Sequence, residues 1–308
     1  MHGGGGINGG NGWTGYTVTY DSIMYYAPCF NPNNSSEFTY IEWDLYLPNR
    51  PKWLCTYNIV TGEKQYLADG ASFNPVWCTN DWIVFNRGGH IWKIQSNGDN
   101  LAPLFTDYAC YDVVVNPSST KMIFYMHNGT WYSTIVSDIN GLVLDSIPNS
   151  YFGEAAWSPD GQYIASTGSQ YHSYGFYDTT LTNYTIIHEG YPNDPPSESV
   201  YDAEWYGDSE NILWYKNREY FITNITTKQT TLFSSLCYNK FNLWPSVASD
   251  NSGILWERNN EANIDGNQYK VSSKTSIELT DMDGNNEFVV LPAAEEVNDW
   301  LRFCSCWN

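Results

Sequence analysis

Basic residues are scarce in this chain. It contains 14 Lys and Arg against 34 Asp and Glu, which gives a formal net charge of −20 at pH 7. Binding a nucleic-acid backbone needs a footprint of Lys and Arg, and docking on anionic lipid needs positive charge as well. The composition therefore argues against nucleic acid and anionic membrane surfaces as partners, and it suits a basic or neutral partner.

Long apolar runs are lacking too. No stretch approaches the roughly 20 apolar residues that span a bilayer, so we predict no membrane insertion. No charged-then-apolar signal segment precedes the first repeat. Residues 1–15 are instead rich in Gly and Asn, which predicts a flexible N-terminal arm. Such an arm could hold the chain in a larger assembly.

The seven cysteines form no CxxC set of the kind that ligates a metal. Cys78 and Cys110 flank one repeat and could bridge in an oxidising compartment. N-glycosylation sequons are present, among them those at Asn34, Asn128, Asn183 and Asn224. These features favour an extracellular or periplasmic location. No motif requires a cofactor.

What the chain does contain is a repeat of about 40–45 residues, which is typical of propeller blades. Each copy has an anchor residue, a polar turn and a β-type strand. The anchors, separated by 47, 38, 42, 48 and 42 residues, are Phe30, Trp77, Val115, Trp157, Trp205 and Val247. A second hairpin follows in every copy, so each unit is predicted to be a four-stranded antiparallel blade. We predict an all-β, six-bladed β-propeller over residues 16–308.

The fourth copy shows the pattern most clearly, in Trp157-Ser158-Pro159-Asp160-Gly161 and the following Ile164-Ala165. This run resembles the repeats of the TolB-like six-bladed propeller family. The resemblance extends over about residues 25–291 and implies the fold. It implies no chemistry, because propellers host unrelated functions.

The longest connecting segments fall on one predicted face of the ring. They comprise residues 43–52, 168–173, 189–199 and 259–274, and we call their side the long-loop face. Loops elaborated on one side of a rigid scaffold mark a functional face. Residues 16–20, 23–26 and 299–303 are β-type runs near the ends of the chain. One terminus is expected to add a strand beside the other and close the ring; alternatively, one run stays outside the ring and mediates assembly.

The position three residues before each anchor is predicted to face the central channel. In three consecutive blades it is acidic, at Asp112, Glu154 and Asp202. Neighbouring like charges raise each other's pKa unless a cation lies between them. These carboxylates therefore form a candidate Ca²⁺ or cationic-ligand site in the channel. The alternative is that they line a water-filled channel or cap backbone N–H groups.

Other candidates lie on the long-loop face. Arg87, His90, His127 and His172 could perform acid–base chemistry on a uronate-type sugar, although polar residues on exposed loops need no such role. The aromatic residues Trp43, Tyr46, Tyr171 and Tyr174 could anchor a protein or stack on sugar rings, or simply pack their loops.

Taken together, the sequence favours a non-catalytic binding or assembly scaffold that recognises a protein or a glycan through the long-loop face. One alternative is a lyase-like, polysaccharide-active enzyme using the axial carboxylates and rim histidines. Another is an accessory subunit of an extracellular or envelope assembly.

Overall fold

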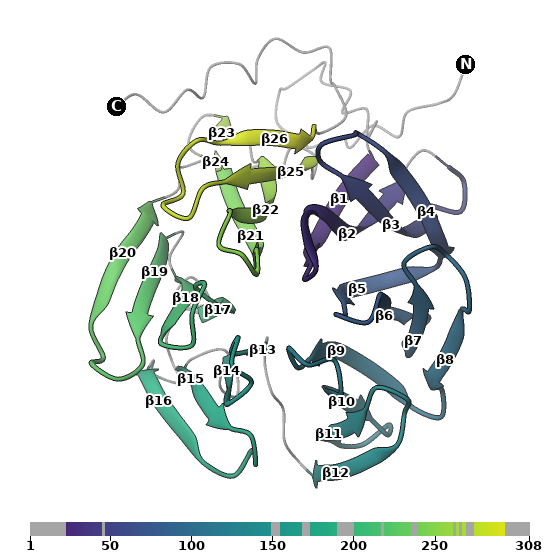
Figure 1. Cartoon of the computed structure of the whole chain (residues 1–308), viewed down its shortest axis with the longest axis horizontal. Helices are drawn as coiled ribbons and strands as arrows, with labels where there is room; N and C mark the ends of the chain where they lie inside the picture. Colours follow the sequence, from purple (N-terminus) through teal and green to yellow (C-terminus); the bar gives the residue numbers. More distant parts are fainter. Residues whose placement is uncertain are drawn as a thin grey trace.

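Six four-stranded antiparallel sheets surround a central axis in the computed structural model (Figure 1). The structure describes residues 23–44, 47–148, 155–167, 173–189, 200–216, 219–235, 240–260, 263–264, 267–268 and 274–292. Over these residues the predicted all-β, six-bladed propeller is confirmed. They include no helix that could serve as a membrane span. The predicted N-terminal arm lies outside them.

Each blade is built from strands that follow one another along the chain. Blade 1 contains β1 (Ile23–Asn31), β2 (Asn34–Asp44), β3 (Lys52–Asn58) and β4 (Lys64–Asp69). Blade 2 contains β5 (Ala71–Trp77), β6 (Trp82–Arg87), β7 (His90–Gln95) and β8 (Ala102–Phe105). Blade 3 contains β9 (Ala109–Val115), β10 (Lys121–His127), β11 (Tyr132–Asp138) and β12 (Val143–Pro148). In each blade the first strand lies nearest the axis (Figure 1).

The second half of the ring repeats this order. Blade 4 contains β13 (Ala155–Trp157), β14 (Tyr163–Thr167), β15 (Ser173–Asp178) and β16 (Tyr184–Glu189). Blade 5 contains β17 (Val200–Trp205), β18 (Asn211–Lys216), β19 (Glu219–Asn224) and β20 (Thr230–Ser235). Blade 6 contains β21 (Lys240–Val247), β22 (Ile254–Asn260), β25 (Lys274–Thr280) and β26 (Phe288–Leu291), with the short ribbon β23 (Asn263–Ile264) and β24 (Asn267–Gln268) inserted.

The turn after the fourth anchor shows how the repeat folds locally. The Ser158 side chain is fully buried, and its Oγ accepts hydrogen bonds from the backbone N–H groups of Gln162 (3.1 Å) and Tyr163 (2.9 Å). The same hydroxyl donates to Asp160 at 2.6 Å. Gly161 has φ +70°, a left-handed conformation that glycine adopts without strain. One buried hydroxyl thus satisfies the donors that start β14.

Replacing Ser158 by Ala should therefore destabilise the protein. The partly buried Tyr163 N–H would lose its acceptor, which costs about 1–3 kcal/mol of the free energy of unfolding, whereas the Gln162 N–H keeps its bond to Asp160 at 3.0 Å. Ser118→Ala is the matched control, because Ser118 is exposed and bonds only to the side chains of Asn116 and Thr120. Denaturant titration checks this prediction. An equal loss of stability in both variants would contradict it.

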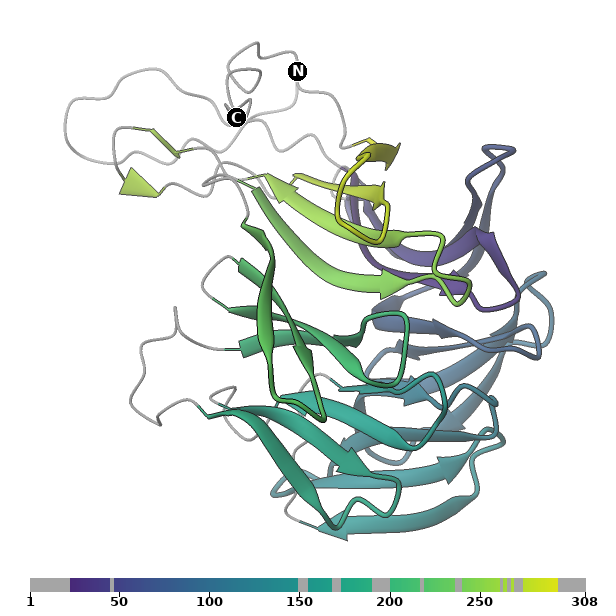
Figure 2. The ribbon, with the colours of Figure 1, turned by 60° about the vertical axis from the view of Figure 1, so that its left-hand side comes forward.

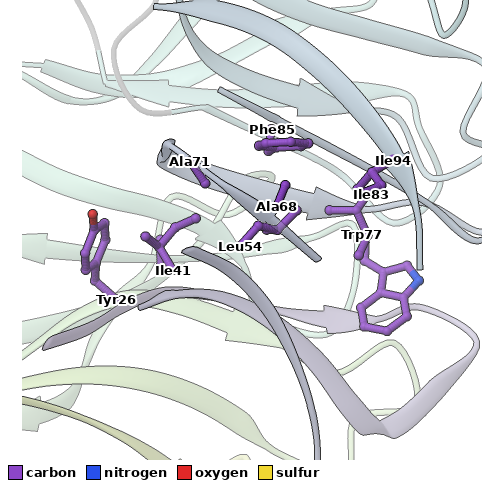
Figure 3. Close-up of a cluster of buried hydrophobic side chains, with 10 residues drawn as sticks. Tyr26, Ile41, Leu54, Ala68, Ala71, Trp77, Ile83, Phe85 and Ile94 are labelled. Atoms are coloured by element: carbon purple, nitrogen blue, oxygen red, sulfur yellow. The ribbon is translucent and has the colours of Figure 1, made fainter. Parts of the chain in front are cut away.

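Apolar side chains of neighbouring blades pack face to face and form the core. Between blades 1 and 2, Ile41 and Leu54 meet Ile83 and other buried side chains (Figure 3). Tyr26 and Trp77 lie at opposite ends of this cluster. Burial of apolar surface contributes about 25 cal/mol per Å². These contacts between sheets, with no strand shared among the described blades, hold adjacent blades together.

The ring closes where blade 6 packs against blade 1 (Figure 2). A shared cluster of buried residues fills this seam, including Phe38 and Tyr40 of blade 1 and Leu255 of blade 6. The hydrogen bonds across it use side chains. Thr275 Oγ1 accepts from the Tyr25 N–H (2.6 Å), Ser246 Oγ from the Phe30 N–H (3.1 Å), Glu257 from the Ala27 N–H (3.3 Å), and Asp250 from the Ser35 hydroxyl (2.8 Å).

This closure differs from the expected terminal clasp. Within the described residues all four strands of blade 1 and all four of blade 6 come from their own continuous segments. The β-type run 23–26 is the first half of inner strand β1 and is not an added strand. Runs 16–20 and 299–303 lie outside the described residues.

Candidate functional site

A cavity of about 230 Å³ lies on the axis and is lined by the inner strands of all six blades. We call it the axial cavity. The residues immediately before the six anchors form one ring of its lining: Cys29, Val76, Val114, Ala156, Glu204 and Ser246. The residues two before the anchors form a second ring: Pro28, Pro75, Val113, Ala155, Ala203 and Pro245. The anchors chosen from the sequence therefore occupy equivalent places around the axis.

The inner strands are irregular next to these rings. Ladder register shifts fall in five of them, at residues 27–28, 73–75, 112–113, 202–203 and 244–245. A β-bulge leaves residues unpaired and re-aims their side chains. Ala27 and Asp112 there have φ +53° and +45°. The positions predicted to face the channel are thus bulges in the described inner strands, which explains why they can line a cavity.

Asp112 is the predicted axial carboxylate that the structure describes in full. It lines the axial cavity and accepts a hydrogen bond from the Tyr125 hydroxyl. Burial raises the pKa of Asp112, and this hydrogen bond opposes the rise. Glu154 lies outside the described residues. Asp202 lies in β17, but its side chain is outside them as well.

Glu204 is an axial carboxyl that sequence reasoning missed. The other five members of its ring are Cys, Val, Ala or Ser, so Glu204 is the one charged residue at this position. Burial raises its pKa to about 7, while the Trp205 N–H, donating to Glu204 at 3.0 Å, opposes the rise. Comparing the six copies at the residue before the anchor would have revealed it.

A third buried carboxyl lies beside the cavity, at the seam between blades 6 and 1. Glu257 of β22 is 4% exposed and accepts the N–H of Ala27, a residue of the cavity lining. Burial raises the pKa of Glu257 to about 8, and the bond from Ala27 lowers it slightly. At neutral pH this carboxyl holds a proton.

These groups limit the chemistry of the axial cavity. Its described lining contains carboxyl, amide and thiol side chains and no Lys, Arg or His. Among the described residues no cluster of three or more His, Cys, Asp or Glu side chains could hold a metal ion. The Ca²⁺ site predicted at Asp112, Glu154 and Asp202 stays a prediction, because two of its three side chains are not described. Asp112 and Glu204 are suited to a cation or to hydrogen-bond donors.

On the long-loop face, several predicted residues lie at strand ends rather than in loops. Arg87 and His90 pair with each other where β6 turns into β7. The Tyr108 carbonyl lies 3.2 Å from His90 Nδ1, and His127 pairs with the adjacent Ala109. The structure therefore brings Arg87, His90 and His127 to one side of blades 2 and 3.

The structure places the predicted aromatic side chains in different surroundings. Trp43 is the penultimate residue of β2 and is half-buried, and its indole N–H donates to the Arg50 carbonyl at 3.1 Å. Tyr174 was expected in a loop, but it lies in β15, fully buried and stacked on Trp214 with ring centroids 5.4 Å apart. It is therefore a core residue that no partner can reach. Tyr46, Tyr171 and His172 lie outside the described residues.

The proposed bridge between Cys78 and Cys110 is absent. Both are buried free thiols, as is Cys55, and Cys29 is free and half-buried. Burial raises the pKa of Cys78 and of Cys110 to about 12. Neutral thiols of this kind behave as small apolar core residues.

Fold and site together define a six-bladed propeller with an acidic axial cavity. No protein-family model and no curated protein matches the chain. Solved structures do. A TolB-type protein from Agrobacterium tumefaciens is similar with a TM-score of 0.61 and 15% identity, over 76% of this chain and 86% of that one.

Two further structures place this likeness in context. An oligogalacturonate lyase in complex with manganese is similar with a TM-score of 0.57 and 13% identity, over 88% of this chain and 78% of that one. The β-propeller domain of the Trilobed protease from Pyrococcus furiosus is described as having an open velcro topology. It is similar with a TM-score of 0.58 and 9% identity, over 89% of this chain and 100% of that one. At such identities the likeness shows the fold, and the predicted TolB-like six-bladed architecture is confirmed.

Proposed function

We propose that this protein is a non-catalytic binding scaffold that recognises a protein or glycan partner on its long-loop face. The observation that carries the proposal is the axial cavity, with two carboxyls and no basic side chain in its described lining. Asp112 and Glu204 are suited to binding a cationic or hydrogen-bond-donating group.

The shared fold, the geometry of the ring and the net charge support a scaffold. Propellers of the TolB type share the fold, and the ring presents strand ends from several blades on one rigid face. The net charge of −20 favours a partner that is basic or neutral. An extracellular or periplasmic location and a place in a larger assembly belong to the same proposal, and cell fractionation of the native protein tests the location.

The binding experiment uses the purified chain on a glycan array and on arrayed basic peptides. Glu204→Gln removes one of the two cavity carboxyls with little change in shape, and exposed Glu63→Gln is the control. Loss of a charged hydrogen bond costs about 1.5–3 kcal/mol, so Glu204→Gln should weaken binding by about tenfold or more while Glu63→Gln leaves it unchanged. Turnover of any acidic polysaccharide by the wild type would favour the lyase alternative instead.

A further inference from the structure

A lysine on the long-loop face has no counterion among the residues that the structure describes. Lys52, at the start of β3, is half-buried beside two aromatic rings, with Nζ 4.5 Å from the Trp43 ring centroid and 5.4 Å from that of Tyr26. Burial lowers its pKa, which reflects the cost of taking the ammonium out of water. Cation–π contacts offset only part of that cost.

Several other basic side chains have polar partners among the described residues. Lys64 and Arg258 pair with carboxylates at 2.5 and 2.6 Å. Lys93 and Lys228 also lie over aromatic rings, but each donates to a backbone carbonyl. Lys52 has neither an ion pair nor a hydrogen bond from its ammonium to any described residue, although the chain carries 34 Asp and Glu. An ammonium that has no polar partner among the described residues is suited to bind an external anion.

A second cation lies close by, across the link between blades 1 and 2. The Gly70 N–H donates to the Lys52 carbonyl (2.7 Å), and a Cβ at Gly70 would lie 3.6 Å from Cγ and Nε of Arg87. The Arg87 guanidinium lies 5.1 Å from the Trp92 ring centroid and pairs with Asp69, which is largely exposed. Trp43 and Trp92 both pack on the same buried cluster, so the two cations have rigid supports.

An exposed aromatic ring lies farther along the same surface. We call the surface formed by Lys52, Arg87, His90 and Tyr108 the strip. Arg87 pairs with His90, and His90 contacts the Tyr108 carbonyl. The Tyr108 side chain is 47% exposed. Between Arg87 and His90, Cβ atoms placed on Gly88 and Gly89 would meet nothing within 4 Å, so the surface above this turn is open. The strip thus combines cations at one end with a flat, accessible ring at the other.

From this arrangement we infer that the long-loop face of blades 1 and 2 binds an acidic saccharide, with a uronate carboxylate on Lys52 and Arg87 and a sugar ring on Tyr108. Carboxylates bind strongly to desolvated Lys and Arg side chains, and phenol rings stack on the apolar faces of sugars. An acidic peptide would supply the charge but has no need of the exposed ring. The inference rests on the proposed binding function and names an acidic partner for this local pair of cations, whereas the net charge of −20 favours basic or neutral partners over the rest of the surface.

Isothermal titration calorimetry with tri-galacturonate tests the inference, with a neutral galactose trimer and hexaglutamate as the comparison ligands. The wild type should bind tri-galacturonate at least tenfold more tightly than either. Lys52→Met should weaken that binding by tenfold or more and Lys52→Arg should retain it. Lys121→Met, at an exposed lysine of blade 3, should leave it unchanged. Thermal melts establish that each variant is folded.

Equal affinity for the acidic and neutral trimers, no effect of Lys52→Met, or binding of hexaglutamate in place of the uronate would each overturn the inference. Glu204→Gln separates it from the broader proposal. If tri-galacturonate does not bind but an arrayed ligand binds in a Glu204-dependent manner, the scaffold function is supported. The saccharide site at Lys52 is then wrong. If nothing binds on either array, the scaffold proposal itself fails.

Discussion

The free energy of unfolding should fall as the pH rises from 6 to 8, and Glu257→Gln should remove most of that fall. The pKa of Glu257 is raised from 4.5 to about 8 in the folded protein. Between these values the folded chain keeps a proton that the unfolded chain releases. Stability is therefore full below about pH 4.5, declines through the window and levels off above about pH 8.

Over the whole window from pH 4.5 to 8 the expected effect is about 5 kcal/mol, because one pKa unit corresponds to about 1.4 kcal/mol, and about half of it falls between pH 6 and 8. Glu204, whose pKa is raised to about 7, adds a smaller decline with the same sign. Asp160 and Asp250 have lowered pKa values and act only in more acidic solution. Gln is a good mimic of the protonated acid, since its carbonyl can still accept the Ala27 N–H.

Urea titrations at intervals of half a pH unit measure this dependence for the wild type, Glu257→Gln and Glu204→Gln. Exposed Glu63→Gln is the control and should follow the wild-type curve. A wild-type stability that stays level from pH 6 to 8 would show that the seam carboxyl is ionised at little cost. If Glu257→Gln keeps the pH dependence of the wild type, another titratable group is responsible for it.

Gly175→Ala should be among the most damaging substitutions in the chain. A Cβ at this position of β15 would lie 2.2 Å from the carbonyl oxygen of Thr185 in the paired strand β16. Real Cβ contacts are never this short, and a backbone atom cannot move aside as a flexible side chain can. Separating two strands of a packed blade costs about 3 kcal/mol or more.

Gly129→Ala is the matched control for this substitution. Gly129 has φ +95° and a Cβ there would meet nothing within 4 Å, so its cost is limited to about 1 kcal/mol of backbone strain. Comparing the melting temperatures of the two variants distinguishes the cost of the steric clash at Gly175 from the cost of backbone strain at Gly129. Similar losses at both sites would mean that β16 can shift away from β15 without disturbing the blade.

Local chemistry explains why the fold could be predicted. A Ser-Pro-Asp-Gly turn such as 158–161 specifies a reversal by its own φ preferences and side-chain bonds. Six copies at nearly constant spacing then require a closed ring, because each sheet must cover its apolar faces with those of its neighbours. The anchors from Phe30 to Val247 consequently occupy equivalent places, and the residues before them line one cavity.

The candidate site could be predicted only in part. The acidic positions near the axis were recognised from the repeat register, and Asp112 does line the cavity. Glu204 was missed because it lies one residue from the anchor, where the other copies carry small side chains. Tyr174 was misplaced because an aromatic residue beside a loop and one inside a strand look alike in sequence. Its burial depends on Trp214 of the next blade.

By itself, the sequence determined the blade, the number of blades and the acidic character of the surface. These follow from turn chemistry, strand alternation and composition, all of which act over short stretches of chain. Only the tertiary structure decided how the ring closes, that Glu257 is buried in the seam, and that Lys52 lies near Arg87 with no counterion among the described residues. Such features depend on which side chains from distant strands meet, and on how much water their packing excludes.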